Sequence, residues 1–132
     1  MLIPELKVSN FQTSLDFYIR LAQFELLYGR LEEEFAMLIK DKSQIMIESL
    51  SDKTRDWKVG VLEYPFGRGM HFQIEISSID SLYNNFKNHN YPIFFEIEEK
   101  WYLKNQSKIW HRQFLVQDPD GYLLRFFEHL DR

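Results

Sequence analysis

Three side chains of different chemistry stand out in segments where apolar and polar residues alternate: Glu48, His71 and Arg125. Because the side chains of a strand point alternately to its two faces, each of the three is expected on the polar face of a strand. If these faces surround one hollow, a carboxylate, an imidazole and a guanidinium converge on it. Such a pocket would bind a small molecule, or Glu48 or His71 would act as general base in an isomerase or lyase. The plainer alternative is a sheet with one polar face in water.

A divalent metal is the sharper hypothesis for the same residues. Glu48 and His71 would supply two ligands and Glu5 a third, whereas a divalent ion needs three or four such donors. Arg125 would bring a positive charge into the same region and repel the ion. The residues therefore favour a site without metal or cofactor. A structural ion pair between Glu48 and Arg125 is a further alternative, since either charge would be costly to bury alone.

The strands that carry these residues belong to two copies of one pattern, which align at a constant offset where Val8-Ser9-Asn10-Phe11 lies over Ile76-Ser77-Ser78-Ile79. The first copy has strands at 2–8, 24–31, 35–39 and 44–50, a helix at 11–21 and a solvated turn at 32–34. The second has strands at 70–76, 91–97, 113–117 and 123–128, a helix at 79–89 and a charged excursion at 98–108. The last two strands flank Asp118-Pro119-Asp120-Gly121, whose Pro and Gly predict a tight turn.

This order predicts a single α+β domain over residues 1–132. Two βαβββ modules, at 1–50 and 69–130, are joined by a polar linker at 51–68. Each helix covers one face of a half-open sheet and leaves the opposite, concave face for a cavity. Alternation places the following residues on the concave side: Glu5, Lys7, Gln44, Met46, Glu48, His71, Gln73, Glu75 and Arg125. The open sheet edges predict a homodimer.

Composition narrows the classes of partner. The net charge is −4 and no stripe of Lys and Arg is present, which argues against nucleic acid and leaves room for a cationic ligand. The absence of cysteine excludes disulfides, thiolate metal sites and a Cys nucleophile. The first residues do not have the pattern of a signal peptide, and no apolar run approaches the roughly 20 residues that cross a bilayer. We therefore expect a cytoplasmic protein without a membrane partner. The 12 Phe, 7 Tyr and 3 Trp allow an aromatic-lined cavity beside an ordinary core.

Three segments, IPELKVSNFQTSLDFY, GMHFQIEI and DPDGYLLRFFE, resemble the glyoxalase/bleomycin resistance/extradiol dioxygenase superfamily, also called vicinal oxygen chelate. The resemblance covers essentially the whole chain. It implies metal ligands on the first strand of each module and near the ends of the fourth and eighth strands. Ile3, Glu48, His71 and Arg125 stand at those four positions. Two of the four ligands are thus lost, which puts glyoxalase or dioxygenase chemistry in doubt.

Within that superfamily the chain is most similar to bleomycin resistance proteins, through EIEEKW and a W-x-R-x-F-x-x-x-D-P-x-G segment at 110–121. The resemblance implies an acidic homodimer for antibiotic resistance, which sequesters a large cationic planar drug without metal in aromatic clefts at the dimer interface. By analogy Trp101, Tyr102 and Trp110 would stack on the ligand, although Trp110 would equally plug the mouth of the barrel. The candidate ligand-binding residues are Glu5, Glu48, His71, Gln73, Trp101, Tyr102, Trp110, Gln113 and Arg125, with no catalytic or metal residue. The alternatives are a glyoxalase-like lyase or isomerase with Glu48 and His71 at a divalent metal, and a small-metabolite binder without a resistance role.

Overall fold

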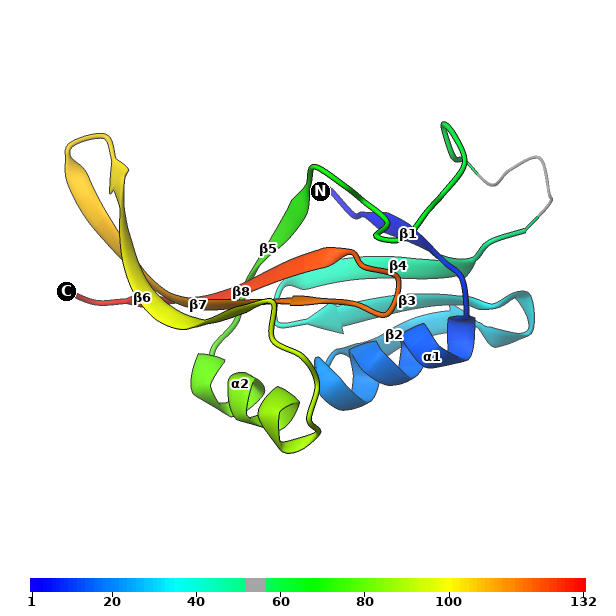
Figure 1. Ribbon diagram of the computed structural model, residues 1–132, viewed down its shortest axis with the longest axis horizontal. Helices are drawn as coiled ribbons and strands as arrows, with labels where there is room; N and C mark the ends of the chain where they lie inside the picture. The colour runs from blue at the N-terminus through cyan, green and yellow to red at the C-terminus, as the bar shows by residue number, and fades with distance from the viewer. Residues whose placement is uncertain (52–56) are drawn as a thin grey trace.

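The computed structural model describes residues 1–51 and 57–132, which form two four-stranded sheets with a helix beneath each (Figure 1). The first module contains β1 (Glu5–Val8), α1 (Phe11–Asp16) with a π-helical continuation (Phe17–Leu21), β2 (Glu25–Arg30), a 3-10 turn (Leu31–Glu33), β3 (Phe35–Lys40) and β4 (Ser43–Ser49). The second contains β5 (His71–Glu75), α2 (Ile79–Asn88), β6 (Phe95–Lys104), β7 (Ser107–Gln117) and β8 (Leu123–Leu130). Within the described ranges, no helix has the length and apolar character that a membrane crossing requires.

The two sheets have the same topology. The strand order is β1-β4-β3-β2 in the first sheet and β5-β8-β7-β6 in the second. In each, the first strand of the module runs parallel to the last, and the other neighbours are antiparallel. The predicted α+β fold of two βαβββ modules is therefore confirmed.

The core lies between the sheets and the two helices, as the alternation of apolar residues predicts. Val8 and Ile47 in the first sheet and Leu124 and Phe126 in the second are fully buried, and Phe86 of α2 packs against Phe126. Burying each such side chain contributes about 1.5–3 kcal/mol relative to leaving it exposed. The buried residues of both modules form one continuous cluster, so the two sheets share a core.

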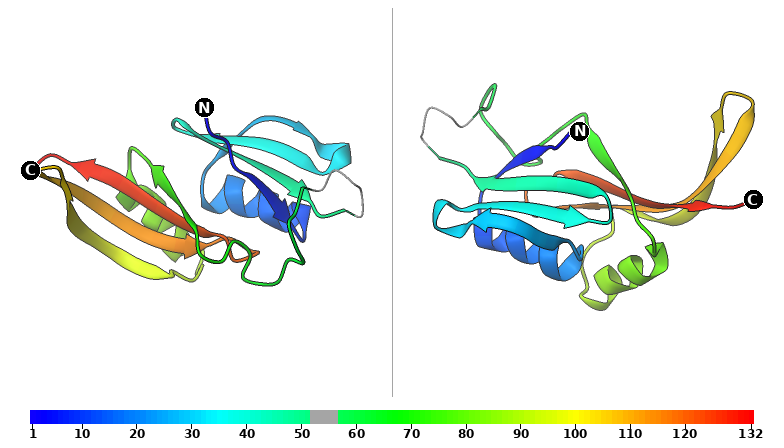
Figure 2. Two further views of the ribbon diagram at one scale, coloured as in Figure 1. Left: turned by 90° about the horizontal axis from the view of Figure 1, so that it is seen from above. Right: turned by 180° about the vertical axis from the view of Figure 1, so that it is seen from behind.

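The terminal hairpin joins the second module to the first. Asp118, in the turn between β7 and β8, accepts a hydrogen bond from the Tyr18 hydroxyl at 2.7 Å and from the backbone N–H groups of Asp120 and Tyr122. Asp120 in turn accepts hydrogen bonds from the backbone and side chain of Ser9, at the end of β1. Both helices lie beneath the sheets (Figures 1 and 2), and α2 contacts the π-helical continuation of α1. These contacts fix one module against the other.

The prediction of a charged excursion at 98–108 is wrong. These residues belong to a long hairpin, in which β6 and β7 turn at Asn105 and project beyond the body of the second sheet (Figure 1). The polar side chains misled the prediction, because both faces of a projecting hairpin are accessible to water and its alternation is weak. The preceding strand also starts later than expected, at Phe95, since Pro92 cannot donate to a ladder.

Candidate functional site

The concave face of the first sheet carries a compact set of charges. Lys7 and Glu48 lie opposite each other on the parallel strands β1 and β4, with Lys7 Nζ 2.6 Å from Glu48 Oε1. The same ammonium lies 3.6 Å from Glu5 Oε1. The Lys7 side chain is only 8% exposed, against 33% for Glu5 and 29% for Glu48. The three polar residues predicted to share this face therefore do so, and one cation holds two carboxylates.

A hollow of about 660 Å³ lies over this face. Its charged and aromatic lining consists of Glu5, Glu32, Glu33, Glu34, Glu48, Arg30, Tyr28, Phe35 and Trp57. Tyr28 and Trp57 are half to two-thirds exposed, and the Arg30 guanidinium lies 4.0 Å from the centre of the Phe35 ring. Among the described residues this lining has five carboxylates and one guanidinium. It is an acidic, aromatic surface.

Sequence reasoning found only part of this hollow. The sequence predicted a solvated turn at 32–34, yet in the structure the 3-10 turn after β2 places these glutamates in the same lining as Glu5 and Glu48. Three consecutive glutamates immediately before a buried strand were the pattern from which a role in the acidic lining could have been predicted. Tyr28 and Trp57 gave no such signal, since a single aromatic residue in a strand or a loop is ordinarily a packing residue.

The concave face of the second sheet has a different chemistry. Gln113 donates from Nε2 to the Tyr102 hydroxyl at 2.7 Å and accepts from Arg125 Nε at 3.0 Å. The Arg125 guanidinium also lies 5.2 Å from the centre of the Tyr102 ring. Gln73 is opposite Arg125 in the ladder of β5 and β8, and His71 is two residues before it on the same face. The structure thus gathers five of the predicted ligand-binding residues here.

A buried histidine, His111, adjoins that group and was missed in the sequence. Its ring stacks on Phe127 with centroids 4.3 Å apart and meets His129 edge-on at 4.8 Å. Neither ring nitrogen has a hydrogen-bond partner among the described residues. Burial lowers the pKa of His111 below its usual value, and the neighbouring His129 and Arg125 lower that pKa further. The side chain is therefore a neutral imidazole near pH 7.

The predicted residues form two separate clusters. The acidic hollow is lined by Glu5 and Glu48 but by neither His71 nor Arg125. The alternative ion pair between Glu48 and Arg125 is wrong, because Glu48 pairs with Lys7, and within residues 1–51 and 57–132 no carboxylate forms an ion pair with Arg125. The parallel pairing of β1 with β4 brings Lys7 to Glu48 first. A ligand role for these residues stays a prediction.

Trp101 and Trp110 do not join Tyr102. They pair with each other across the β6–β7 ladder, so they occupy the face of the hairpin opposite to Tyr102. Each has a cation on its ring, with Lys108 Nζ 4.4 Å from the Trp101 centroid and the Arg132 guanidinium 5.0 Å from that of Trp110. Within one chain the three proposed stacking residues therefore present two surfaces.

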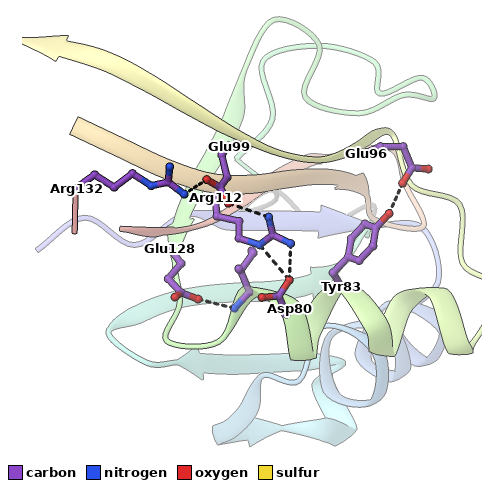
Figure 3. Close-up of polar contacts among 8 residues, drawn as sticks. Asp80, Tyr83, Glu96, Glu99, Arg112, Glu128 and Arg132 are labelled. Carbon is purple, nitrogen blue, oxygen red and sulfur yellow. Dashed lines mark hydrogen bonds and ion pairs between the residues drawn. The ribbon is translucent and has the colours of Figure 1, made fainter. Parts of the chain in front are cut away.

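The helix side of the second sheet is held by a network of ion pairs (Figure 3). Arg112 binds Asp80 of α2 at 2.8 Å and Glu99 of β6 at 3.3 Å, and Arg132 also contacts Glu99. Glu128 of β8 accepts from the backbone N–H of Ile79, at the start of α2. Arg112, the arginine of the W-x-R-x-F segment, therefore fastens α2 to the sheet and faces away from Arg125.

Several known proteins resemble this chain in sequence or in fold. No protein-family model matches the chain. A bleomycin resistance protein from Geobacillus stearothermophilus is 29% identical over 137 residues, covering 97% of this chain and 96% of that protein. A glyoxalase/bleomycin resistance protein/dioxygenase superfamily member from Vibrio splendidus 12B01 is 31% identical, with 96% and 95% of the two chains covered and a TM-score of 0.44. A glyoxalase/bleomycin resistance protein/dioxygenase from Alicyclobacillus acidocaldarius shares the fold with a TM-score of 0.67 at 22% identity, over 99% and 92% of the chains.

The paired βαβββ modules and their two concave faces define a protein of the two-module α+β class. With 29% identity to the bleomycin resistance protein over 97% of this chain and 96% of that protein, and with the fold of the Alicyclobacillus acidocaldarius protein, the chain is similar to the glyoxalase/bleomycin resistance/dioxygenase superfamily. The resemblance noted in the sequence is thereby confirmed.

Proposed function

We propose that this protein is a metal-free, cytoplasmic binding protein that sequesters a small molecule with a cationic group and a planar part, as its bleomycin resistance relatives suggest. The observation that carries the proposal is the acidic hollow over the first sheet, where carboxylates surround exposed aromatic rings. A cation would be attracted by the excess negative charge, and a planar group would stack on Tyr28 or Trp57.

The charge balance of the floor supports this ligand class. Lys7 neutralises only one of the two carboxylates beside it, so Glu5 and Glu48 keep a net negative charge in a partly buried place. Glu32 and Glu34 have no ion-pair partner in the described part of the chain, whereas Glu33 is engaged by Arg30. Charges that lack a protein partner are those that a ligand can engage with the least competition.

We also propose that the binding unit is a homodimer. The strands β2 and β6 are sheet edges, and β2 exposes Leu26, Leu27 and Tyr28 to water. Long apolar edges of this kind are covered in most native assemblies. Light scattering after gel filtration should give twice the 16.1 kDa of one chain, and a monomer at every concentration tested would reject the dimer.

Bleomycin is the probe for the binding proposal, because it is the drug that the relatives' names provide. Drug at 100 times its Kd should stabilise the protein by about 2.7 kcal/mol, which raises Tm by roughly 10 °C in a chain of this size. The double variant Glu32→Gln with Glu48→Gln should weaken binding by about 1 kcal/mol, roughly fivefold in Kd. Glu63→Gln, an exposed site outside the hollow, is the matched control and should bind as the parent does. An unchanged Tm at saturating drug would reject bleomycin as the ligand.

A further inference from the structure

The second sheet carries two arginines in opposite circumstances. Arg112, on the helix side, is engaged by the carboxylates of Asp80 and Glu99. Arg125, on the concave side, makes no ion pair with any described residue, although it is partly buried. A guanidinium that has lost part of its hydration without gaining a carboxylate is an unusual arrangement in a folded protein. The arginine with no carboxylate is the one on the concave face.

Arg125 is nevertheless held in place. Its Nε donates to Gln113, which is itself buried and anchored by the Tyr102 hydroxyl, and its guanidinium lies over the Tyr102 ring. These contacts use one edge of the guanidinium. The two Nη groups have no hydrogen-bond partner in residues 1–51 and 57–132. A fixed guanidinium with both terminal nitrogens available matches the two oxygens of a carboxylate or a phosphate.

A second unpartnered group lies on the same face. His111 precedes Gln113 by two residues on β7, so the two side chains point to the same side of the sheet. The imidazole is only 3% exposed and both of its nitrogens lack partners in the described structure. Buried polar groups in native proteins nearly always have a hydrogen-bond partner, and an exception calls for a ligand, a water or a functional role. The Tyr102 hydroxyl, which accepts from Gln113, keeps its own hydrogen for a further acceptor.

We propose that the concave face of the second sheet binds a small organic oxyanion, a carboxylate or a phosphate monoester, through the paired Nη groups of Arg125, with Tyr102 and His111 as neutral donors. This site is separate from the acidic hollow and takes a ligand group of opposite charge. Two carboxylates share this face in register, Glu75 on the adjacent strand β5 and Glu98 opposite Gln113 on β6, yet neither forms an ion pair with Arg125. Glu75 lies 3.7 Å from His129 instead.

The test is a titration of the full chain followed by proton–nitrogen NMR. Benzoate and phenyl phosphate serve as the anionic probes, and benzamide is the uncharged counterpart of benzoate. One anion, or both, should shift the Arg125 Nε–H and the Gln113 side-chain amide along a saturating curve. Benzamide should bind at least tenfold more weakly. The tighter of the two anions then identifies the carboxylate or the phosphate class.

Variants make the test decisive. Arg125→Gln should weaken the anion at least tenfold, and Arg125→Lys should recover part of that loss, because it restores the charge without the paired donors. Glu48→Gln, in the acidic hollow, should leave anion binding unchanged, so failure here is distinct from failure of bleomycin binding. The proposal is overturned if neither anion shifts the Arg125 resonance, if benzamide binds equally well, or if Arg125→Gln and Arg125→Lys both bind like the parent.

Discussion

The concave faces of the two sheets are built on one plan but carry opposite chemistry. In the first sheet Lys7 lies opposite Glu48 and Glu5 opposite Met46. In the second, the corresponding ladder pairs Glu75 with Phe127 and Gln73 with Arg125. The first face thus contains its own counterion, whereas Arg125 stands where the first sheet has a methionine and meets no carboxylate in the described chain.

This difference shows which property the internal repeat determines. The repeat sets the strand order, the parallel closing pair and the burial of alternate residues, because all three follow from backbone pairing and apolar pattern. It does not set charge, since residues on a concave face are free to differ without disturbing the core. A repeated fold can therefore offer two sites of different specificity, and each has to be argued from its own side chains.

The largest expected loss of stability comes from a substitution in the turn between β7 and β8, which holds the second module against the first. Asp118→Ala removes the acceptor for the Tyr18 hydroxyl and for two backbone N–H groups, all in a buried place. We expect a loss of about 3 kcal/mol of unfolding free energy, since buried donors left without partners bear their full desolvation cost. Chemical denaturation measures the loss. Asp131→Ala, at the exposed C-terminal end, is the control and should be neutral, whereas equal stability of the two variants would contradict the role of the hairpin.

Two substitutions test whether the concave faces of the two sheets differ in their internal electrostatics. Lys7→Met leaves Glu48 and Glu5 side by side without their shared ammonium, and should destabilise the protein by about 2 kcal/mol. Arg125→Met removes a charge that has no carboxylate partner among the described residues, so its cost should be limited to about 1 kcal/mol, which comes from leaving the buried Gln113 Oε1 without its donor. Urea unfolding of both variants gives the two numbers. Equal losses would mean that the faces do not differ in their internal electrostatics.

Lys7→Met should also change the affinity of the acidic hollow for a cationic ligand. Without the internal cation, the floor of the acidic hollow should hold a cationic ligand more tightly, at the same time as the fold becomes weaker. A bleomycin titration of Lys7→Met against the parent would measure this. Opposite signs for stability and affinity are expected of a residue that occupies the place of a ligand charge, and a loss of both would assign Lys7 a supporting role instead.

The sequence predicted the fold better than the sites. Apolar alternation around Val8 and Phe126 identified the strands, and Gly121 was expected in a tight turn, where its φ is 95° in the structure. The predicted ion pair between Glu48 and Arg125 does not form. Alternation predicts which face of the sheet a residue occupies, but it does not predict which residue lies nearest on the neighbouring strand. His111 was missed for a related reason: its burial depends on Phe127, which is sixteen residues away in sequence.

The smallest expected effect is a pH dependence of the unfolding free energy, which arises from His111 on the concave face of the second sheet. Burial lowers the pKa of His111 in the folded protein below its unfolded value of about 6.5. The unfolded chain therefore binds the proton more readily, so the stability linked to His111 is complete above pH 6.5 and is lost as the pH falls toward the folded pKa. The groups around the ring are His129 and Arg125 on β8, Glu75 on β5 and Lys100, which lies opposite His111 on β6.

His111→Phe keeps the stacking on Phe127 and removes both unpartnered nitrogens. We expect it to raise the unfolding free energy by about 1 kcal/mol at pH 7 and to reduce the loss of stability between pH 6.5 and pH 5. Unfolding at both pH values, with the pKa read from the His111 ring proton by NMR, checks the two claims. A His111 pKa at or above 6.5, or a variant with the parent's pH dependence, would show that the imidazole already has a partner. In that case only the Arg125 guanidinium, which has no carboxylate partner in the described chain, would distinguish the concave face of the second sheet from that of the first.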